Sequence, residues 1–486
     1  MEISLRHYQQ KGKDQLYKSI ADEGHKRVIF WLATGGGKSR TQCNIVGDLI
    51  ACNAKVVMVM RRRELIKQMS GNLDEWNIEH GIYMAMHPRF KPNRDVQVCS
   101  IDTLGAREVY PHEDCKNVVV LIDESHDATP SAKKYRDLFE RYKHATIIGF
   151  TATPFSNNTL FDDIICPITP MQLMEEGFLT PVKCYVPNII DVSKVTVKRT
   201  GQFDEEELFK ACSDSEVVGN IVDDWVRYGQ GRRTVLFAVN IEHSKMLCDA
   251  FNKRGIPATH CDGGTKSGER DRALRRLKEE EIKILCNVNV FSTGLDLVEI
   301  ECIIFARPTR SLIYYLQAIG RGLRPAPHIN KENCIIIDSA GNTLRFGSPY
   351  KSREAIIGKP KPLPKEEIED LSIRFCKQCG FVFDSKEKKC PDCGFINPII
   401  IREIKTRDGE LIEYDLSPEE IDAMNKSLFK KDYFKLEFVA KNRIFKNMSS
   451  GDRKDQKVLE WVCSKLVEKF GLKFCEENEN LLPKRY

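Results

Sequence analysis

The 486-residue sequence has no long apolar run. A membrane-spanning helix needs roughly 18–20 consecutive apolar residues, and no stretch approaches that length. The first ten residues, MEISLRHYQQ, also lack the apolar segment of a secretory signal. These two absences argue against a membrane partner and predict a cytoplasmic location, in the cytosol or on the nucleoid.

A strong charge of either sign is also missing, because 75 Lys and Arg against 70 Asp and Glu leave a net charge of +5. This balance permits nucleic acid as a partner but does not argue for it, so a basic binding surface would have to be local. Hydrophobic residues make up 41% of the chain, which is sufficient for well-packed cores. The length predicts about two to four domains.

A disulfide framework is not expected, despite the 18 cysteines. Most of them stand singly in apolar runs, as Cys43, Cys99 and Cys286 do, which is typical of reduced thiols in a core. Four others form two Cys-x-x-Cys-Gly pairs, and that spacing predicts a structural zinc ribbon over residues 371–398. The predicted Zn²⁺ ligands are Cys376, Cys379, Cys390 and Cys393.

The chain is organised around residues 28–39, VIFWLATGGGKS. An apolar run over residues 28–32 predicts a buried parallel strand, a glycine turn follows, and a helix is expected over residues 39–53. Glycines let backbone N–H groups surround phosphate oxygens, the lysine adds positive charge, and the serine hydroxyl can reach Mg²⁺. One departure is Leu32, where such loops usually carry glycine. The predicted ATP-binding loop consists of Thr34, Gly35, Gly36, Gly37, Lys38 and Ser39.

Two further strands are predicted over residues 55–60 and 96–100. Basic residues follow the first strand and hydroxyl residues follow the second. Because parallel sheets bind ligands at the carboxyl ends of their strands, these side chains are candidates for contacts to nucleic-acid phosphates. The candidates are Arg62, Arg63, Ser100 and Thr103.

An acidic pair follows a fourth apolar run, over residues 118–122. At the tip of a strand, Asp123 and Glu124 can divide two tasks: one acid holds Mg²⁺, and the other orients and deprotonates the attacking water. A further buried strand at residues 145–150 leads into Thr151-Ala-Thr-Pro, whose hydroxyls could sense the γ-phosphate.

Strands alternate with helices again over residues 216–345, which predicts a second parallel sheet. This lobe has no phosphate loop, but it carries a glycine turn at residues 291–296 and a helix with Gln317, Arg321 and Arg324. The two arginines lie three residues apart on one helical face and can form a cationic fork toward the γ-phosphate. An arginine finger of this kind contributes about 10³–10⁵ in rate in other phosphoryl-transfer enzymes.

In this order, the phosphate loop, Asp-Glu-x-His and Thr-Ala-Thr-Pro resemble the first motor lobe of a superfamily-two helicase or translocase. Residues 170–181, 317–325 and 338–342 resemble, more closely, the RadD-type helicases of bacteria. The resemblance covers about residues 1–395 and implies two RecA-like lobes, a cysteine zinc module, and action on DNA in repair and recombination. In two respects the chain departs from that family: Ser125 replaces an alanine, and the C-terminal tail has no recognised counterpart.

The resemblance also implies roles for single residues. Arg6 and Gln9 would contact adenine, because a glutamine amide offers both a donor and an acceptor. The glycine turn of the second lobe would line the ATP cleft and touch nucleic acid, and the arginine helix would close the cleft. The residues concerned are Thr293 for nucleic acid, and Gly294, Asp296, Gln317, Arg321 and Arg324 for ATP.

The predicted fold class is α/β, with two tandem RecA-like lobes, a four-cysteine zinc ribbon and a small helical C-terminal region. Between residues 426 and 457, ten Lys and Arg against four Asp and Glu make the tail basic, and its aromatic spacing favours a packed helix face over base stacking. The predicted segments are lobe 1 at 1–185, a linker or insertion at 186–215, lobe 2 at 216–345, a Pro/Lys-rich linker at 346–370, the ribbon at 371–398 and the tail at 399–486.

The predicted activity is DNA-stimulated hydrolysis of ATP with Mg²⁺, coupled to translocation along DNA or remodelling of DNA in repair, recombination or replication. A monomer is expected, in a bacterial or phage-infected cell, with single-stranded or branched DNA and single-strand-binding or recombination proteins as partners. Two alternatives remain open. One is an ATP-dependent RNA helicase, which would depend on the 2′-OH. The other is a nucleotide-gated DNA-binding clamp that does not step.

Overall fold

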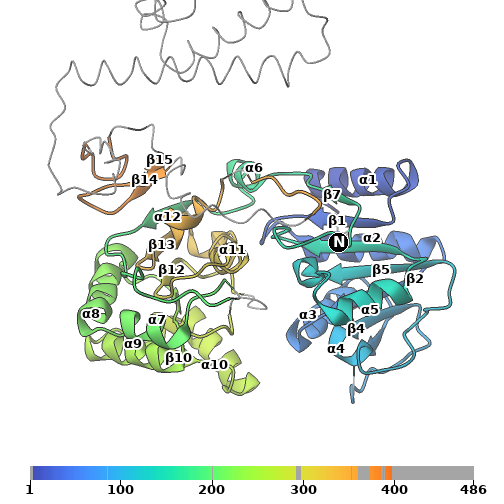
Figure 1. The fold of residues 1–486 in the computed structure, drawn as a ribbon, viewed down its shortest axis with the longest axis horizontal. Coiled ribbons are helices and arrows are strands. Elements are labelled where there is room, and N and C mark those ends of the chain that lie inside the picture. Colours follow the sequence, from blue (N-terminus) through green and yellow to red (C-terminus); the bar gives the residue numbers. More distant parts are fainter. Residues whose placement is uncertain are drawn as a thin grey trace, which may run out of the picture. The chain divides into compact units, whose positions relative to one another are not determined.

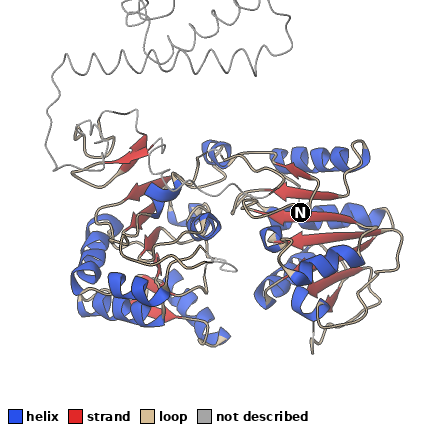
Figure 2. Ribbon diagram, in the orientation of Figure 1, coloured by secondary structure: helices blue, strands red, loops and turns tan. Residues whose placement is uncertain are grey.

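The computed structural model describes residues 4–84, 86–199, 201–291, 297–351, 353–358, 373–384, 387 and 389–396. These residues form two α/β lobes and a small two-stranded sheet (Figure 1; Figure 2). The predicted tail at 399–486 and the glycine-turn residues 292–296 lie outside the described residues. Within the described part of the chain, no helix combines the length and the apolar character needed to cross a membrane.

The first lobe contains a seven-stranded sheet in which all pairings are parallel. The strands are β1 (Arg27–Trp31), β2 (Lys55–Met60), β3 (Gly81–Tyr83), β4 (Val96–Ser100), β5 (Val118–Asp123), β6 (Thr146–Thr151) and β7 (Asp163–Ile165). The helices are α1 (His7–Ala21), α2 (Lys38–Ala51), α3 (Arg63–Glu75), α4 (Ile101–Leu104), α5 (Lys133–Arg141) and α6 (Pro170–Glu175). The order across the sheet is β3-β4-β2-β5-β6-β1-β7.

Burial on both faces explains why these strands are continuous apolar runs in the sequence. In β2, Val56 and Met58 belong to a core that includes apolar residues of α1, α2 and α3. Val57 and Val59 belong to the opposite core, which includes apolar residues of α5. Successive side chains of a strand point to opposite faces, so a sheet covered on both sides needs an apolar residue at nearly every position. The predicted strands of this lobe are confirmed.

The second lobe contains a six-stranded parallel sheet in the order β10-β11-β9-β12-β13-β8. Its strands are β8 (Val182–Tyr185), β9 (Thr234–Phe237), β10 (Ala258–Cys261), β11 (Ile284–Asn287), β12 (Cys302–Phe305) and β13 (Cys334–Asp338). Its helices are α7 (Glu205–Cys212), α8 (Ser215–Asp224), α9 (Ile241–Lys253), α10 (Ser267–Lys278), α11 (Leu312–Gly320) and α12 (Asn342–Phe346). Two sheets of this kind confirm the predicted fold class of tandem RecA-like lobes.

The lobe boundary predicted at residue 185 has to be moved. Strand β8 pairs with β13 in parallel and therefore belongs to the second sheet, so that lobe begins near residue 182. The segment 186–215, predicted as a linker, packs on the same lobe, where Ile190, Leu208 and Cys212 form a cluster with Val239. The polar composition of this segment gave no sign of the packing, because α7 is short and buries only Leu208 and Cys212.

The first part of the predicted linker at 346–370 is also packed. The Tyr350 hydroxyl is buried and donates to the Thr180 carbonyl at 2.6 Å. Farther along, the Gly358 amide donates to Asn158 Oδ1 at 2.7 Å, and the Asn158 amide donates to the Gly358 carbonyl at 3.2 Å. Tyr350 and Gly358 therefore contact Thr180, just before the second lobe, and Asn158 of the first lobe, and the rest of this linker, from residue 359, lies outside the described residues.

The cysteine segment forms the third sheet, which pairs β14 (Ile373–Phe375) with β15 (Val382–Asp384) in antiparallel register. It docks against the free edge of β8. The Val186 amide donates to the Gly380 carbonyl at 2.8 Å, and the Tyr185 hydroxyl donates to Asp392 at 3.3 Å. Tyr185 also packs edge-on against Phe381 at 5.4 Å between ring centroids. These contacts protect the edge of the second sheet.

Candidate functional site

The glycine loop between β1 and α2 has backbone conformations that glycine adopts readily. Gly35 and Gly37 have φ angles of +88° and +86°. A Cβ atom on Gly37 would lie 2.3 Å from Nε2 of Gln9, so no larger residue fits there without a shift. Helix α2 begins directly at Lys38, whose Nζ donates to the Leu32 carbonyl at 3.3 Å. The loop therefore presents a helix N-terminus and an ammonium group to the same space, as an anion site requires.

The surroundings of Leu32 explain why a leucine stands where such loops usually carry glycine. It is fully buried, and its amide donates to the Thr151 carbonyl at 3.0 Å, which continues the pairing of β1 with β6 by one residue. A Cβ atom on Gly36 would lie 2.7 Å from Cγ of Leu32. The leucine thus fills the space beneath the loop, and the glycine above it leaves room for that side chain.

The start of α1 holds the loop from the other side. Gln9 is fully buried, and its Nε2 donates to the carbonyls of Gly36 and Gly37 at 3.2 and 3.1 Å. Its Oε1 accepts from the Arg6 amide at 2.9 Å, and the Tyr8 hydroxyl donates to the Gly36 carbonyl at 3.0 Å. The adenine contacts of Arg6 and Gln9 stay predictions. Tyr8 was missed by the sequence analysis, and its only signal there is its position beside the glutamine.

The acidic pair lies at the carboxyl end of β5, as predicted. Asp123 is the last residue of the strand and accepts from Nε2 of Gln42, on α2, at 3.0 Å. Glu124 follows in a left-handed conformation with φ of +50° and ψ of +49°. Such a conformation costs a non-glycine residue about 1–3 kcal/mol and is common at functional sites. It turns the Glu124 side chain out of the strand direction.

The surroundings of the two carboxylates shift their pKa values in opposite directions. Burial raises the pKa of Asp123 to about 6, and the adjacent charge of Glu124 adds to this rise. Burial of Glu124 disfavours its charged form and by itself would raise its pKa. The hydrogen bond from His126 and the positive charges of Lys38, His126 and Arg321 outweigh this effect and lower the pKa to about 2. Neighbouring acids whose pKa values are pushed apart are typical of sites where each acid has its own role.

His126 connects the acidic pair to the second lobe. Its Nδ1 lies 3.2 Å from Oε2 of Glu124 and 3.1 Å from Oγ1 of Thr151, at the end of β6. Its Nε2 lies 3.3 Å from Nε2 of Gln317, on α11. Burial opposes the charge of His126, but the hydrogen bond and the charge of Glu124 raise its pKa. A lone histidine gives no such signal in the sequence, so this bridging role was not predicted.

The end of α11 and the residues that follow it lie against the phosphate loop. The predicted common helical face of Arg321 and Arg324 is wrong, because α11 ends at Gly320 and Arg324 lies beyond the helix. A Cβ atom on Gly320 would lie 2.5 Å from Cβ of Thr34, and one on Gly35 would lie 3.2 Å from Cγ of Arg324. Arg321 is 9% exposed and is close enough to Glu124 to lower the pKa of that acid. The structure therefore places Lys38, the acidic pair, Arg321 and Arg324 close to one another.

A cavity of about 400 Å³ lies beside this constellation, between the two lobes. Arg62 faces it from the first lobe, next to Arg61, which pairs with Asp127 at 3.0 Å. Glu124, His126 and Gln317 line the same space, so the predicted phosphate-contacting arginine and Glu124 of the acidic pair share one cavity. The remaining lining residues are Leu65, Asn289, Ser311, Ile313 and Tyr314.

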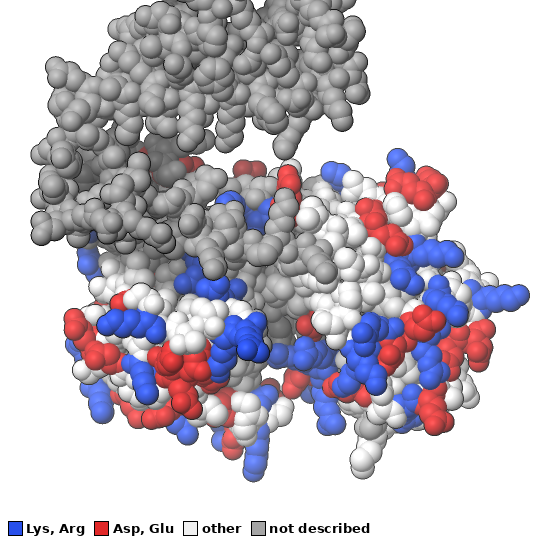
Figure 3. Space-filling model, in the orientation of Figure 1, with Lys and Arg blue, Asp and Glu red and all other residues white. Residues whose placement is uncertain are grey.

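The other predicted nucleic-acid contacts are less accessible or lie elsewhere. Ser100 is only 6% exposed, so few of its atoms face solvent, whereas Thr103 is half-buried on α4. Arg63 begins α3 at the end of the strand that neighbours β4. Thr293, Gly294 and Asp296 lie outside the described residues. On the face drawn in Figure 3, basic side chains are interspersed with acidic ones, in agreement with the small net charge.

The four paired cysteines come together in space. All four Sγ atoms lie within 4.8 Å of one another, with 3.5 Å between Cys376 and Cys393 and 3.7 Å between Cys379 and Cys390. Four sulfurs around a tetrahedral zinc, at Zn–S distances near 2.3 Å, would lie about 3.8 Å apart. The cluster therefore fits a closed four-thiolate metal site, although other divalent metals accept the same ligands.

Comparison with known proteins finds a family model that matches part of each lobe. Residues 2–156 match the family model of the type III restriction enzyme, res subunit, and residues 216–326 match the helicase conserved C-terminal domain. A 51.5 kDa protein of a Lactococcus phage is 26% identical over 368 residues, which cover 74% of this chain and 76% of the phage protein.

The putative ATP-dependent helicase IRC3 of Saccharomyces cerevisiae is 29% identical over 361 residues, which cover 69% of this chain. The match spans only 51% of the yeast protein, so this chain corresponds to about half of that relative. Among solved structures, a fragment of a putative HsdR subunit of a type I restriction enzyme from Vibrio vulnificus superposes with a TM-score of 0.54 at 19% identity. That match covers 73% of this chain and 67% of the fragment, and it supports the two-lobed fold.

Proposed function

Because its lobes match the models of the type III restriction enzyme, res subunit, and of the helicase conserved C-terminal domain, we propose that the chain is an ATP-hydrolysing motor that translocates along DNA or remodels it. One observation carries the proposal: Gln317, Arg321 and Arg324 reach the phosphate loop and the acidic pair from a separate lobe. ATP bound between the lobes would make its full set of contacts only while they are closed. Hydrolysis would then release the closed state, and nucleic acid lying across both lobes would be moved stepwise.

Each residue of the site has a definite task in this proposal. Lys38 and the loop amides hold the β- and γ-phosphates, and Arg321 and Arg324 stabilise the charge that develops during transfer. Glu124 stays anionic, orients the attacking water and takes its proton. Ser39 and Asp123 would hold Mg²⁺, which would supply positive charge against the phosphates. His126 and Gln317 contact each other across the cleft, so this contact would form only while the second lobe lies against the acidic pair.

DNA is the proposed substrate. The model that matches the first lobe is named for the res subunit of a type III restriction enzyme, and a solved structure of similar fold is that of an ATP-dependent Type ISP restriction-modification enzyme bound to DNA. The motifs shared with the RadD-type helicases support a role in repair, recombination or replication in a bacterial or phage-infected cell. Single-stranded or branched DNA, and single-strand-binding or recombination proteins, are the proposed partners of a cytoplasmic or nucleoid-associated monomer. An RNA helicase or a clamp that does not step is the alternative, but the intact Glu124 and Arg324 argue against the clamp.

The test compares ATP turnover of the full chain with single-stranded DNA, with RNA of the same sequence, and without nucleic acid. We expect stimulation by DNA and little by RNA. Equal stimulation by both would favour the RNA alternative or an indifferent motor, and absence of turnover under all three conditions would refute the proposal. A fork-unwinding assay on the same DNA then separates strand separation from translocation alone.

The Glu124→Gln variant should bind ATP and fail to hydrolyse it. The amide cannot accept a proton from water, and loss of a general base typically costs about 10²–10⁴ in rate. Steady-state turnover and a nucleotide titration measure the two effects separately. Glu242→Gln, an exposed acid in the first turn of α9, serves as the matched control and should change neither. Wild-type turnover in Glu124→Gln would assign the proton transfer to another group.

Zinc is the proposed metal of the cysteine cluster, so metal analysis should find one zinc per chain. Cys376→Ser should lower that content, and because the cluster docks on β8, it should also lower the melting temperature of the second lobe. Cys166→Ser, at an exposed cysteine far from the cluster in sequence, should do neither. A wild-type protein without bound metal would contradict this assignment.

A further inference from the structure

The side-chain amide of Gln9 is bound to the backbone of the phosphate loop and of α1. Gln9 is 0% exposed, and its Nε2 donates to the carbonyls of Gly36 and Gly37 at 3.2 and 3.1 Å. Its Oε1 accepts from the Arg6 amide at 2.9 Å. A glutamine amide has two N–H donors, and the two glycine carbonyls match that number. Both donors of Gln9 are therefore used within the protein.

Recognition of adenine would require Gln9 to give up these bonds. Adenine presents an acceptor, N7, beside a donor, the N6 amino group, so a glutamine recognises it with the donor and the acceptor of its amide together. Turning the Gln9 amide toward a base would break its bonds to both glycine carbonyls, and buried polar groups are costly to leave without partners. The bonds that connect the phosphate loop to α1 therefore compete with contacts to the base.

The side chains beside Gln9 offer flat surfaces on which a base can stack. Cζ of Arg6, which is exposed, lies 4.6 Å from the ring centroid of Phe178, which is half-buried. Nη1 of Arg6 donates to the Tyr8 hydroxyl at 2.9 Å, and that hydroxyl donates to the loop at the Gly36 carbonyl. A planar guanidinium and an aromatic ring bind any base by stacking, because every base has a π-face.

We propose that Arg6 and Phe178 bind the base by stacking and that Gln9 positions the phosphate loop without selecting the base, so that the chain hydrolyses GTP, CTP and UTP as well as ATP. This inference rests on the proposed function and names the substrate class of the same site. In each case water attacks the γ-phosphorus, the bond to the β-phosphate oxygen breaks, and the products are the nucleoside diphosphate and inorganic phosphate.

The direct test measures turnover of the full chain with each of the four nucleotides, Mg²⁺ and saturating single-stranded DNA. We expect kcat to agree within about threefold and kcat/KM to differ by less than about 200-fold. Sites that hydrogen-bond a substrate group reject an analogue without it by about 10⁴–10⁵-fold, whereas apolar contact surfaces discriminate by only about 10–200-fold. A preference for ATP over GTP above that limit would overturn the inference and leave the proposed function standing. If none of the four is hydrolysed, the proposed function itself is refuted.

Phe178→Leu tests the stacking surface. The variant keeps an apolar side chain and loses the ring, so KM should rise by about 5–50-fold for all four nucleotides while kcat stays near wild type. Phe90→Leu is the matched control, because its ring also lies under an arginine, Arg107 at 5.0 Å, in the loop after the edge strand β3. An unchanged KM in Phe178→Leu would overturn the stacking assignment. If that variant melts too low to assay, Arg6→Ala, at an exposed position, provides the same comparison.

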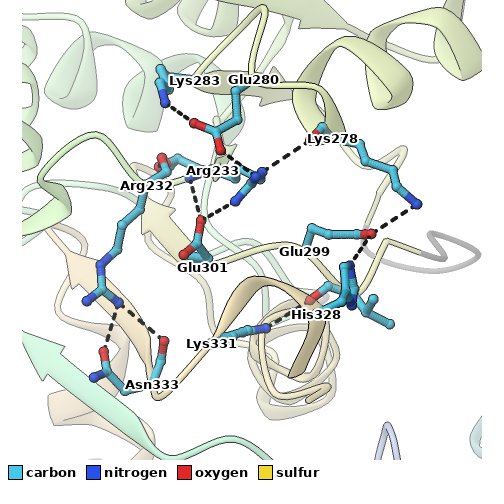
Figure 4. Close-up of polar contacts among 12 residues, drawn as sticks. Arg232, Arg233, Lys278, Glu280, Lys283, Glu299, Glu301, His328, Lys331 and Asn333 are labelled. Atoms are coloured by element: carbon cyan, nitrogen blue, oxygen red, sulfur yellow. Dashed lines mark hydrogen bonds and ion pairs between the residues drawn. The ribbon is translucent and has the colours of Figure 1, made fainter. Parts of the chain in front are cut away.

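Gln9→Ala separates support of the loop from selection of the base. We expect kcat/KM to fall by about 10–100-fold and by nearly the same factor for all four nucleotides, because the loop holds the same triphosphate in each. A loss for ATP more than tenfold greater than the loss for GTP would overturn the inference. Asn333→Ala is the control and should change none of the four values. Asn333 accepts from Nη1 of Arg232 at 2.8 Å, just before β13 in the other lobe (Figure 4).

Discussion

Lys38→Ala is expected to abolish measurable ATP turnover. Lys38 opens α2 at the glycine loop, and its charge helps to keep the pKa of Glu124 low. Removing one preorganised charge or donor from an active site typically costs at least about 10²–10³ in rate. This variant loses both the contact with the β- and γ-phosphates and part of the positive field at the catalytic base Glu124. Steady-state turnover with saturating DNA measures the effect.

The fold of Lys38→Ala should remain intact. The half-exposed side chain has a 3.3 Å contact with the Leu32 carbonyl, and a neutral acceptor of this kind contributes about 1 kcal/mol. Thermal melting should therefore change by only a few degrees. Lys18→Ala, at an exposed position in the last turn of α1, is the control and should hydrolyse ATP normally. Retained turnover in Lys38→Ala would remove the phosphate-loop assignment.

Arg324→Ala should lower kcat by about 10³-fold and weaken ATP binding much less. Cγ of Arg324 lies beside Gly35 of the phosphate loop, yet the residue belongs to the second lobe. A cation supplied from a separate lobe acts mainly on the charge that develops as the γ-phosphate is transferred, and such arginines are worth about 10³–10⁵. Pre-steady-state turnover and nucleotide binding measured on the same preparation separate the two effects.

Two variants test this assignment more closely. Arg324→Lys keeps the charge but loses the planar fork, so it should recover only a small part of the rate. Arg272→Ala, an exposed arginine on α10, should leave kcat and affinity unchanged. If Arg324→Ala weakened ATP binding without lowering kcat, the arginine would contribute to ground-state binding only, and the two-lobe mechanism would need a different catalytic cation.

The sequence by itself determined the two sheets, the phosphate loop and the cysteine cluster. Strands buried on both faces must be apolar at almost every position, so β1, β2 and β5 are readable without any knowledge of their neighbours. The loop and the cysteine pairs can also be predicted from short stretches of sequence. The positive φ angles of the loop fall on Gly35 and Gly37, and each cysteine pair is only three residues apart.

Only the tertiary structure decided what depends on residues far apart in the chain. Strand β8 joins the second sheet through pairing with β13, about 150 residues later, and no short pattern encodes that partner. His126 gains its bridging position from Gln317, 191 residues later in the chain. A single histidine carries no local signal, because its chemistry is set by the charge, burial and hydrogen-bond partners that folding places around it.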